Sequence, residues 1–231
     1  MAYLFEPEAP RSVSITGELA QFPVRRIFCV GRNYVAHAAE MGGEVDREAP
    51  WYFTKSAFAM TAAGGTVPFA PGTQDLHYEM ELVVALHAPV FRCSPDAAAA
   101  AVFGYGCGLD MTRRDLQQVA KDNRRPWDLG KDIENGAILA PLTRAADVGP
   151  LGPQRISLRQ NGVVKQDATL ADMVWSVPEI IVHLSRYYHL GPGDLIMTGT
   201  PAGVGPVQPG DVLEGAIDGL APLTVAIGPA D

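Results

Sequence analysis

Two glutamates interrupt an apolar run that is otherwise typical of a buried strand, the segment 76–84 with the sequence Leu-His-Tyr-Glu-Met-Glu-Leu-Val-Val. Side chains alternate between the two faces of a strand, so Glu79 and Glu81 are predicted to point the same way. Two carboxylates on one face of a buried strand repel each other unless a positive charge lies between them. A divalent cation meets this need most simply, because hard cations take oxygen ligands.

Asp110 follows a second apolar, glycine-rich run, residues 103–109, and offers a third oxygen ligand. Three carboxylates without a nearby pair of histidines favour Mg²⁺ or Mn²⁺ over Zn²⁺. The sequence therefore predicts a metal-assisted reaction on a small oxygen-rich substrate.

The bulk composition excludes several classes of partner. The formal net charge is −8 and the chain has no basic run, which argues against nucleic acid. No apolar run approaches the ~20 residues of a membrane span, and segment 1–10 lacks the basic and apolar regions of a signal peptide. We therefore expect a cytoplasmic protein without a membrane partner. The three cysteines are widely spaced and are expected to be small buried hydrophobes.

The organisation of the chain favours one large α+β domain. Its 231 residues, 47% of them hydrophobic, suffice for a sizeable core. Short apolar runs outnumber helical segments and show no regular βαβ alternation, which indicates an α+β fold. Residues 1–23 are predicted to form an N-terminal arm, and residues 24–231 a catalytic domain.

The expected elements follow from apolar periodicity and from turn residues. Thr112 is expected to cap one of the helices, and Asn161-Gly162 is expected to turn a β-hairpin between 156–159 and 163–166. Residues 61–75 are expected to be a loop. The main strands are predicted at 25–30, 51–54, 78–86, 103–110, 194–197, 211–214 and 223–227. Helices are predicted at 33–41, 94–101, 112–123 and 176–188.

His37 and Glu40 are three residues apart on an expected helix and therefore share a face. A carboxylate beside an imidazole fixes its tautomer and raises its basicity, as a general base requires. The pair is equally compatible with an exposed, solvated helix face, and the spacing alone favours that second interpretation. The flanking glycines, Gly31 and Gly42-Gly43, favour a segment that can hinge.

Other polar residues lie close in sequence to the three carboxylates. Arg114 and Gln117 share a helix face just after Asp110, where groups that recognise an anion are useful. Lys55 and Lys131 each follow an apolar stretch, although a lone lysine usually faces solvent. The turn 198–205 carries free backbone amides and two threonines, so it is either an anion nest or a plain turn.

Taken together, these segments resemble the fumarylacetoacetate hydrolase superfamily, whose motifs they match in order. The matching segments are 30–34 with His37 and Glu40, 76–82, 104–117, 126–131 and 193–205. Segments 3–5, 22–24 and 124–127 are further similar to the bacterial fumarylpyruvate hydrolases of the gentisate pathway, a branch of that superfamily. The resemblance implies a mixed β-roll core with a few flanking helices, a bound Mg²⁺ or Mn²⁺, and a homodimer.

The resemblance also implies roles for individual residues. The metal ligands would be Glu79, Glu81 and Asp110. The catalytic residues would be His37 and Glu40, a lid dyad that activates water, and Lys131. The substrate-binding residues would be Arg114, Gln117 and Thr200, with Lys55 counted among them.

Two positions depart from the pattern of the superfamily. Many relatives have a second histidine where this chain has Tyr78, whose side chain is expected to face away from the metal. Relatives often have Lys-Ser-Phe-Asp where this chain has Lys-Asp-Ile-Glu at 131–134. The second departure leaves the acyl group of the substrate open.

The reaction that the resemblance implies is hydrolysis of a carbon–carbon bond in a 2,4-dioxo acid, such as fumarylpyruvate to fumarate and pyruvate. Acylpyruvase, oxaloacetate decarboxylase and keto–enol tautomerase activities are alternatives, since the last two pass through the same metal-bound enolate. A non-catalytic metal-binding protein is a third interpretation, and the presence of the complete residue set argues against it.

Overall fold

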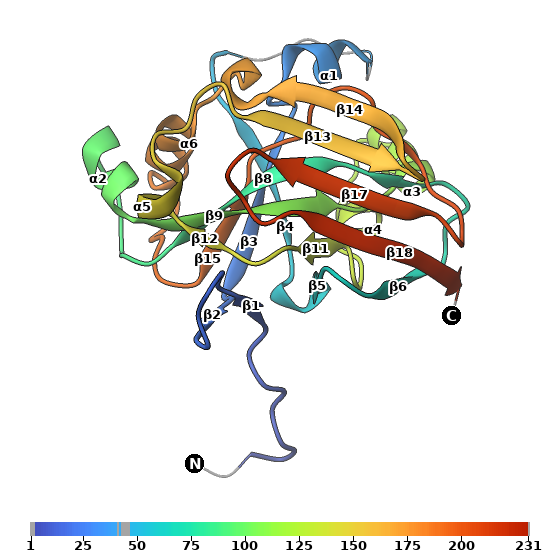
Figure 1. The fold of residues 1–231 in the computed structure, drawn as a ribbon, viewed down its shortest axis with the longest axis horizontal. Coiled ribbons are helices and arrows are strands. Elements are labelled where there is room, and N and C mark those ends of the chain that lie inside the picture. The colour runs from blue at the N-terminus through green and yellow to red at the C-terminus, as the bar shows by residue number, and fades with distance from the viewer. Residues whose placement is uncertain (1–2, 41, 43–46, 231) are drawn as a thin grey trace.

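The computed structural model describes residues 3–40, 42 and 47–230, and its centre is a mixed eight-stranded sheet. The strand order is β4-β3-β15-β8-β9-β11-β5, with β12 paired to β9, and β15 runs parallel to β3. The sheet curls around the core (Figure 1). Its strands are β3 (Arg26–Gly31), β4 (Trp51–Lys55), β5 (Met60–Ala62), β8 (Met80–Leu86), β9 (Val102–Asp110), β11 (Ala137–Leu139), β12 (Thr143–Arg144) and β15 (Asp194–Met197).

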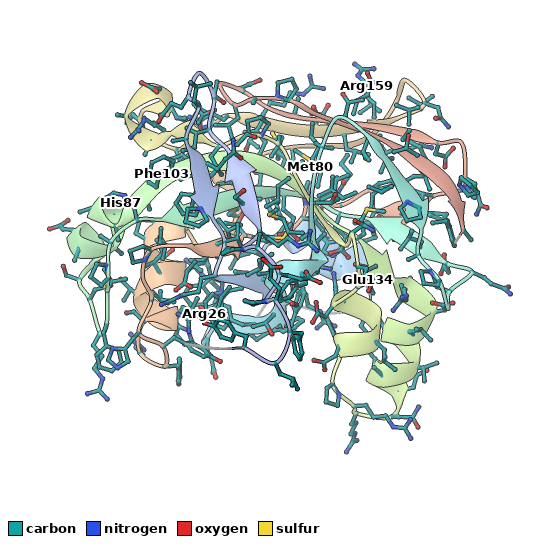
Figure 2. All side chains as sticks on the ribbon, turned by 90° about the horizontal axis from the view of Figure 1, so that it is seen from below. Arg26, Met80, His87, Phe103, Glu134 and Arg159 are labelled. Atoms are coloured by element: carbon teal, nitrogen blue, oxygen red, sulfur yellow. The ribbon has the colours of Figure 1, made fainter. Side chains whose placement is uncertain are left out.

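A second, five-stranded sheet covers one face of the central sheet, as Figure 1 shows, with order β14-β13-β17-β18-β6. Leu82 and Leu109 of the central sheet and Leu158 and Leu213 of the second sheet belong to one buried apolar cluster. In Figure 2, Met80 lies in the interior and Arg159 at the outer margin. The strands are β6 (Thr66–Phe69), β13 (Arg155–Gln160), β14 (Val163–Thr169), β17 (Val212–Ile217) and β18 (Leu223–Ala230).

The burial patterns explain these two layers. Every residue of β8 is buried, as expected for a strand covered on both faces. In β17, buried and exposed residues alternate, so one face packs on the core and the other faces water. Gly104 lets β12 approach β9, because a Cβ there would lie 2.2 Å from the Thr143 carbonyl oxygen.

Two small sheets complete the architecture. One joins β7 (Leu76–Tyr78), β10 (Thr112–Arg113) and β16 (Gly205–Pro206), and the other pairs β1 (Ser12–Ser14) with β2 (Gln21–Pro23). Val13 and Phe22 of the β1–β2 pair are buried in a second apolar cluster with Leu195 and Met197 of the central sheet. Residues 3–10 extend away from the body in Figure 1.

The described helices are short and lie around the sheets. The α-helices are α1 (Val35–Glu40), α2 (Pro95–Ala100), α3 (Arg114–Asp122), α4 (Asp128–Lys131), α5 (Ala145–Val148) and α6 (Val177–Leu184), with 3-10 turns at Ala57–Ala59 and Leu170–Asp172. No helix in the described part of the chain is both long and apolar enough to cross a membrane. The predicted α+β class with a mixed β-roll core and few helices is confirmed.

Three local predictions were wrong. The expected loop 61–75 contains the end of β5 and all of β6, whose short runs give too weak a periodic signal. Thr112 is paired in β10 and does not cap the following helix, which begins at Arg114. The expected strand 78–86 is broken at Glu79, where the chain leaves the β7 sheet and enters β8. The hairpin turn at Asn161-Gly162 is confirmed.

Buried Asp194 fixes the start of β15 beside β3. Its carboxylate accepts hydrogen bonds from the guanidinium groups of Arg25 and Arg26 at 2.7–3.0 Å and from the Gly191 N–H at 3.0 Å. Burial opposes the ionisation of Asp194, but these donors outweigh it and hold its pKa below the ordinary value.

We expect Asp194→Asn to lower the free energy of unfolding by about 1–3 kcal/mol at neutral pH, because two cations lose their acceptor. A depressed folded-state pKa stabilises the protein above the unfolded pKa of about 3.9. The difference between wild type and variant should therefore shrink as the pH falls below about 4. Urea unfolding over pH 3–7 measures this, with exposed Asp147→Asn as the control; a pH-independent difference would contradict it.

Candidate active site

Three buried carboxylates converge where the chain enters β8. One oxygen from each of Glu79, Glu81 and Asp110 lies within 4.8 Å of the others. Their side chains come together because Glu81 pairs with Gly108 across β8 and β9, and because the Asp110 N–H donates to the Glu79 carbonyl oxygen at 2.9 Å. The cluster predicted from sequence therefore forms, although Glu79 lies in the break between two strands.

Glu79 is held by two cations. Lys131 Nζ donates to Glu79 Oε2 at 2.7 Å, and Arg114 Nη2 donates to Oε1 at 2.6 Å. Burial opposes ionisation of Glu79, but these two charges outweigh it and keep its pKa below the usual range. Lys131 also donates to Asp110 Oδ2 and Thr112 Oγ1, each at 2.7 Å. All three ammonium protons of Lys131 are therefore used within the chain.

Glu81 has no such cation among the described residues. Its Oε2 accepts the backbone N–H of Gly199 at 2.8 Å. Burial, followed by repulsion from Asp110 and Glu79, raises its pKa well above the usual value. The negative charge of the cluster is therefore compensated at Glu79 and Asp110 but not at Glu81.

The donor set fits a divalent cation of the magnesium or manganese type. Asp110 Oδ1 lies 2.8 Å from the Lys55 ammonium, yet this buried oxygen accepts no hydrogen bond. Together with the uncompensated Glu81 it offers oxygen lone pairs that no described group uses. Carboxylate oxygens are the ligands that hard cations prefer, and a bound cation would relieve the repulsion at Glu81.

A cavity opens onto Glu79 and Glu81, whereas Asp110 is fully buried and is not on its wall. The cavity wall includes most of the site residues expected from sequence, namely His37, Glu79, Glu81, Arg114, Gln117, Lys131 and Thr200. Tyr78 and the segment 132–134 are not on this wall. Gln117 Oε1 accepts from Arg114 Nη1 at 2.7 Å, whereas its amide nitrogen makes no hydrogen bond to any described residue.

Sequence reasoning missed five charged or aromatic residues of the cavity wall: Arg32, Trp51, Phe53, Lys121 and Trp127. For Lys121 a signal existed, because it lies four residues after Gln117 and seven after Arg114 on the same helix face. The aromatic residues gave no such signal, since Trp and Phe in apolar segments usually fill the core.

His37 and Glu40 form the expected pair at one side of the cavity. His37 Nδ1 lies 3.2 Å from Glu40 Oε2, and His37 is buried whereas Glu40 is partly exposed. Burial lowers the pKa of His37. A carboxylate beside Nδ1 favours a proton there, which leaves the lone pair on Nε2. Of the expected hinge glycines, Gly43 lies outside the described residues, as does Met41.

The turn 198–205 holds carboxylates of the protein itself. Gly199 N–H donates to Glu81, and Gly203 N–H donates to Glu40 Oε1 at 3.0 Å. Thr200 Oγ1 accepts from Gln166 at 2.8 Å and faces the cavity, so its own proton is free to point inward. The anion nest considered from the sequence therefore binds Glu81 of the carboxylate cluster and Glu40 of the His37–Glu40 pair through its backbone N–H groups.

Lys55 lies behind the cluster and is absent from the cavity wall. Its buried ammonium contacts Asp110 and donates to the backbone carbonyl oxygens of Met111 and Lys131. In this structure it supports Asp110 and the end of α4.

We expect Lys55→Met to lower the free energy of unfolding by about 3 kcal/mol, since it leaves Asp110 Oδ1 buried without its cation while Lys131 pairs only Oδ2. Urea unfolding in the presence of a chelator isolates this loss from metal binding. Exposed Lys165→Met is the matched control and should stay within about 0.5 kcal/mol of wild type. A loss below about 1 kcal/mol would mean that Lys55 is not needed to balance Asp110.

Comparison with known proteins gives a consistent result. Residues 26–227 match the family model for the fumarylacetoacetate (FAA) hydrolase C-terminal domain. A fumarylpyruvate hydrolase of Ralstonia is 48% identical over 193 residues, which cover 83% of this chain and 100% of that protein. An oxaloacetate tautomerase of Escherichia coli K12 is 35% identical over 204 residues, covering 88% and 93%. Fumarylpyruvate hydrolase from Pseudomonas aeruginosa, crystallised with Mn²⁺ and pyruvate, has a TM-score of 0.95 and 44% identity, covering 99% and 100%.

Proposed function

Because the chain belongs to the fumarylacetoacetate hydrolase family, we propose that it is a metal-dependent hydrolase that cleaves fumarylpyruvate into fumarate and pyruvate. The observation that carries the proposal is one cavity whose wall holds two carboxylates of the buried cluster, Glu79 and Glu81, together with His37, the imidazole of the His–Glu pair. The carboxylate cluster would hold the cation that polarises a keto acid, and the His–Glu pair would activate water. Two relatives named for this reaction, at 48% and 44% identity, support the choice of substrate.

Glu79, Glu81 and Asp110 would hold Mg²⁺ or Mn²⁺. A divalent cation supplies Lewis-acid polarisation of the 2-oxo acid and stabilises the negative charge that develops as the carbon–carbon bond breaks. The Mn²⁺ in the Pseudomonas aeruginosa complex supports a divalent ion in this fold. The chain's own contribution is a cavity lined at Glu79 and Glu81 by buried carboxylate oxygens.

His37 would act as the general base. Its Nε2 takes a proton from water, which then attacks the carbonyl carbon of the acyl group. Glu40 accepts a hydrogen bond from the Nδ1–H group of His37 and stabilises the imidazolium that forms. Because burial lowers the pKa of His37, the imidazole is in its neutral, basic form at neutral pH. After bond cleavage the same imidazolium can return a proton to the leaving carbon.

Gln117 is the donor best placed to stabilise the tetrahedral oxyanion, since its amide nitrogen has no other described partner. Lys131 can share this role only by giving up one of its three hydrogen bonds. Thr200 can donate a hydrogen bond from its hydroxyl group to the carboxylate at the pyruvyl end of the substrate. Arg114, engaged by Glu79 and Gln117, would act on that carboxylate mainly through its charge.

The wider setting also belongs to the proposal. The resemblance to the gentisate-pathway enzymes supports a role in the breakdown of aromatic compounds, in a cytoplasmic homodimer. An oxaloacetate tautomerase is the alternative, favoured by relatives at 35–36% identity.

The proposal predicts metal-dependent loss of fumarylpyruvate absorbance with one pyruvate formed per substrate consumed. Activity should appear with Mn²⁺ or Mg²⁺ and disappear with chelator. Glu81→Gln should lower the metal content, measured by elemental analysis, because it removes one anionic ligand. If the protein does not turn over fumarylpyruvate but isomerises or decarboxylates oxaloacetate, the proposed hydrolase function is wrong and the alternative function is favoured.

His37→Ala should reduce kcat by roughly 10²–10⁴-fold while metal content stays at the wild-type level, because it removes the base and no ligand. Near-normal turnover would exclude the dyad mechanism.

Glu40→Gln serves as the partner variant of His37→Ala. Glu40 raises the pKa of His37 through its hydrogen bond and charge, against the larger lowering by burial. In wild type the acidic limb of kcat/KM should lie below the ordinary imidazole value of about 6.5, and Glu40→Gln should move it lower still. A shift to higher pH would contradict this orientation of the pair.

A further inference from the structure

Two cations on the cavity wall have no anionic partner among the described residues. Arg32 follows β3 and Lys121 lies near the end of α3, and both side chains line the cavity. Within the described part of the chain, neither forms an ion pair or a hydrogen bond through its side chain. By contrast, Lys55, Arg114 and Lys131 are each paired with a carboxylate of the cluster. The proposed mechanism uses neither Arg32 nor Lys121.

Burial places these two cations in the outer part of the cavity. Glu79 and Glu81 line the cavity and are buried, as is Asp110 beside them, whereas Arg32 and Lys121 are only half-buried. Burial lowers the pKa of Lys121, and repulsion from Arg114 and Arg32 lowers it further. The cavity thus concentrates uncompensated positive charge in a chain whose net charge is −8. Such a site favours an anionic group of the ligand.

An aromatic wall joins the floor to these cations. Lys131 Nζ lies 4.8 Å from the centroid of Phe53, whose ring is 6.1 Å from that of Trp127. Lys121 Nζ lies 5.2 Å from the centroid of Trp127 on the same wall. The two aromatic rings therefore connect the Lys131 ammonium group to the Lys121 ammonium group through a continuous series of contacts.

Trp51 completes the wall and is fixed in place by close packing. Its ring is 4.9 Å from that of Trp127, in edge-to-face geometry. A Cβ at Gly31 would lie 2.1 Å from the Trp51 ring, so only glycine fits beneath it. Directly after Gly31, Arg32 has a φ of 53°, a left-handed conformation that is uncommon for a residue with a side chain.

We propose that Arg32 and Lys121 bind the second carboxylate of a dicarboxylic acylpyruvate, at the opposite end from the keto acid on the cavity floor. This inference rests on the proposed hydrolase function and identifies the substrate class within it. Fumarylpyruvate carries a carboxylate at each end of a flat conjugated chain. The flat apolar chain would lie along Phe53, Trp51 and Trp127, and the terminal carboxylate would meet the two free cations. Acetylpyruvate lacks that carboxylate and would leave both cations unpaired.

The test is the ratio of kcat/KM for fumarylpyruvate to kcat/KM for acetylpyruvate. Lys121→Met and Arg32→Gln should each lower this ratio roughly tenfold or more, since each removes a charge-assisted hydrogen bond made to only one substrate. The loss should lie mainly in KM for fumarylpyruvate, because a distal contact is made equally in the ground and transition states. Lys121→Arg keeps the charge and should keep most of the ratio.

A second readout does not depend on turnover of a dioxo acid. Fumarate contains the distal carboxylate, so its competitive inhibition constant should rise in Lys121→Met and Arg32→Gln. Lys165→Met is the matched control on an exposed strand position and should leave both quantities as in wild type. If Lys121→Met fails to fold, Lys121→Gln retains a polar side chain and still removes the charge.

The outcomes separate the two proposals. If wild type hydrolyses fumarylpyruvate but both substitutions change the ratio by less than about twofold, the distal-carboxylate site is wrong and the hydrolase function stands. If wild type does not hydrolyse fumarylpyruvate at all, the proposed function fails, and this inference fails with it.

Discussion

The ammonium group of Lys131 between Glu79 and Asp110 is the interaction on which the site depends. Buried carboxylates cost several kcal/mol each unless they are paired, and Lys131 compensates two of them at once with 2.7 Å hydrogen bonds. It reaches them from α4, a helix that lies next to β4 and β10 in the fold. Lys55 holds that helix from behind, because its ammonium group donates a hydrogen bond to the Lys131 carbonyl oxygen. The geometry of the cluster is therefore set by two lysines, Lys55 on β4 and Lys131 on α4, and α4 is itself positioned by its contacts with β4 and β10.

A single turn couples the cluster to the His–Glu pair. Residues 198–205 donate one backbone N–H to Glu81 and another to Glu40, so the proposed metal ligand and the proposed base are held by the same few peptide units. Backbone donors suit this task, because they bind carboxylates without adding a mobile charge. The arrangement gives a physical reason for a glycine-rich turn beside the site.

The sequence predicts which residues supply the chemistry of the site better than it predicts the contacts that hold those residues in place. Glu79 and Glu81 could be found because strand alternation is a local rule, and the rule gave the right cluster even though β7 and β8 are separate strands. The β-roll came from the family resemblance, since short strands paired over long sequence separations carry little local signal. The position of Lys55 behind Asp110 could not be inferred, because it depends on a contact between residues far apart in sequence. For the same reason the place of Arg32 in the site could not be inferred, because only the folded chain brings Arg32 and Lys121 onto one cavity wall.

Charge alone does not separate the hydrolase from a tautomerase of the same family, since oxaloacetate and fumarylpyruvate are both dianions. The distance between the charges does. In the proposed site a ligand would run along Phe53 and Trp127, whose rings connect the Lys131 and Lys121 ammonium groups by contacts of 4.8–6.1 Å. Oxaloacetate has only a methylene and a carbonyl group between its carboxylates, so its two charges lie closer together than those of fumarylpyruvate. If Arg32 and Lys121 bind the distal carboxylate as proposed, the cavity would distinguish substrates by length and terminal charge together.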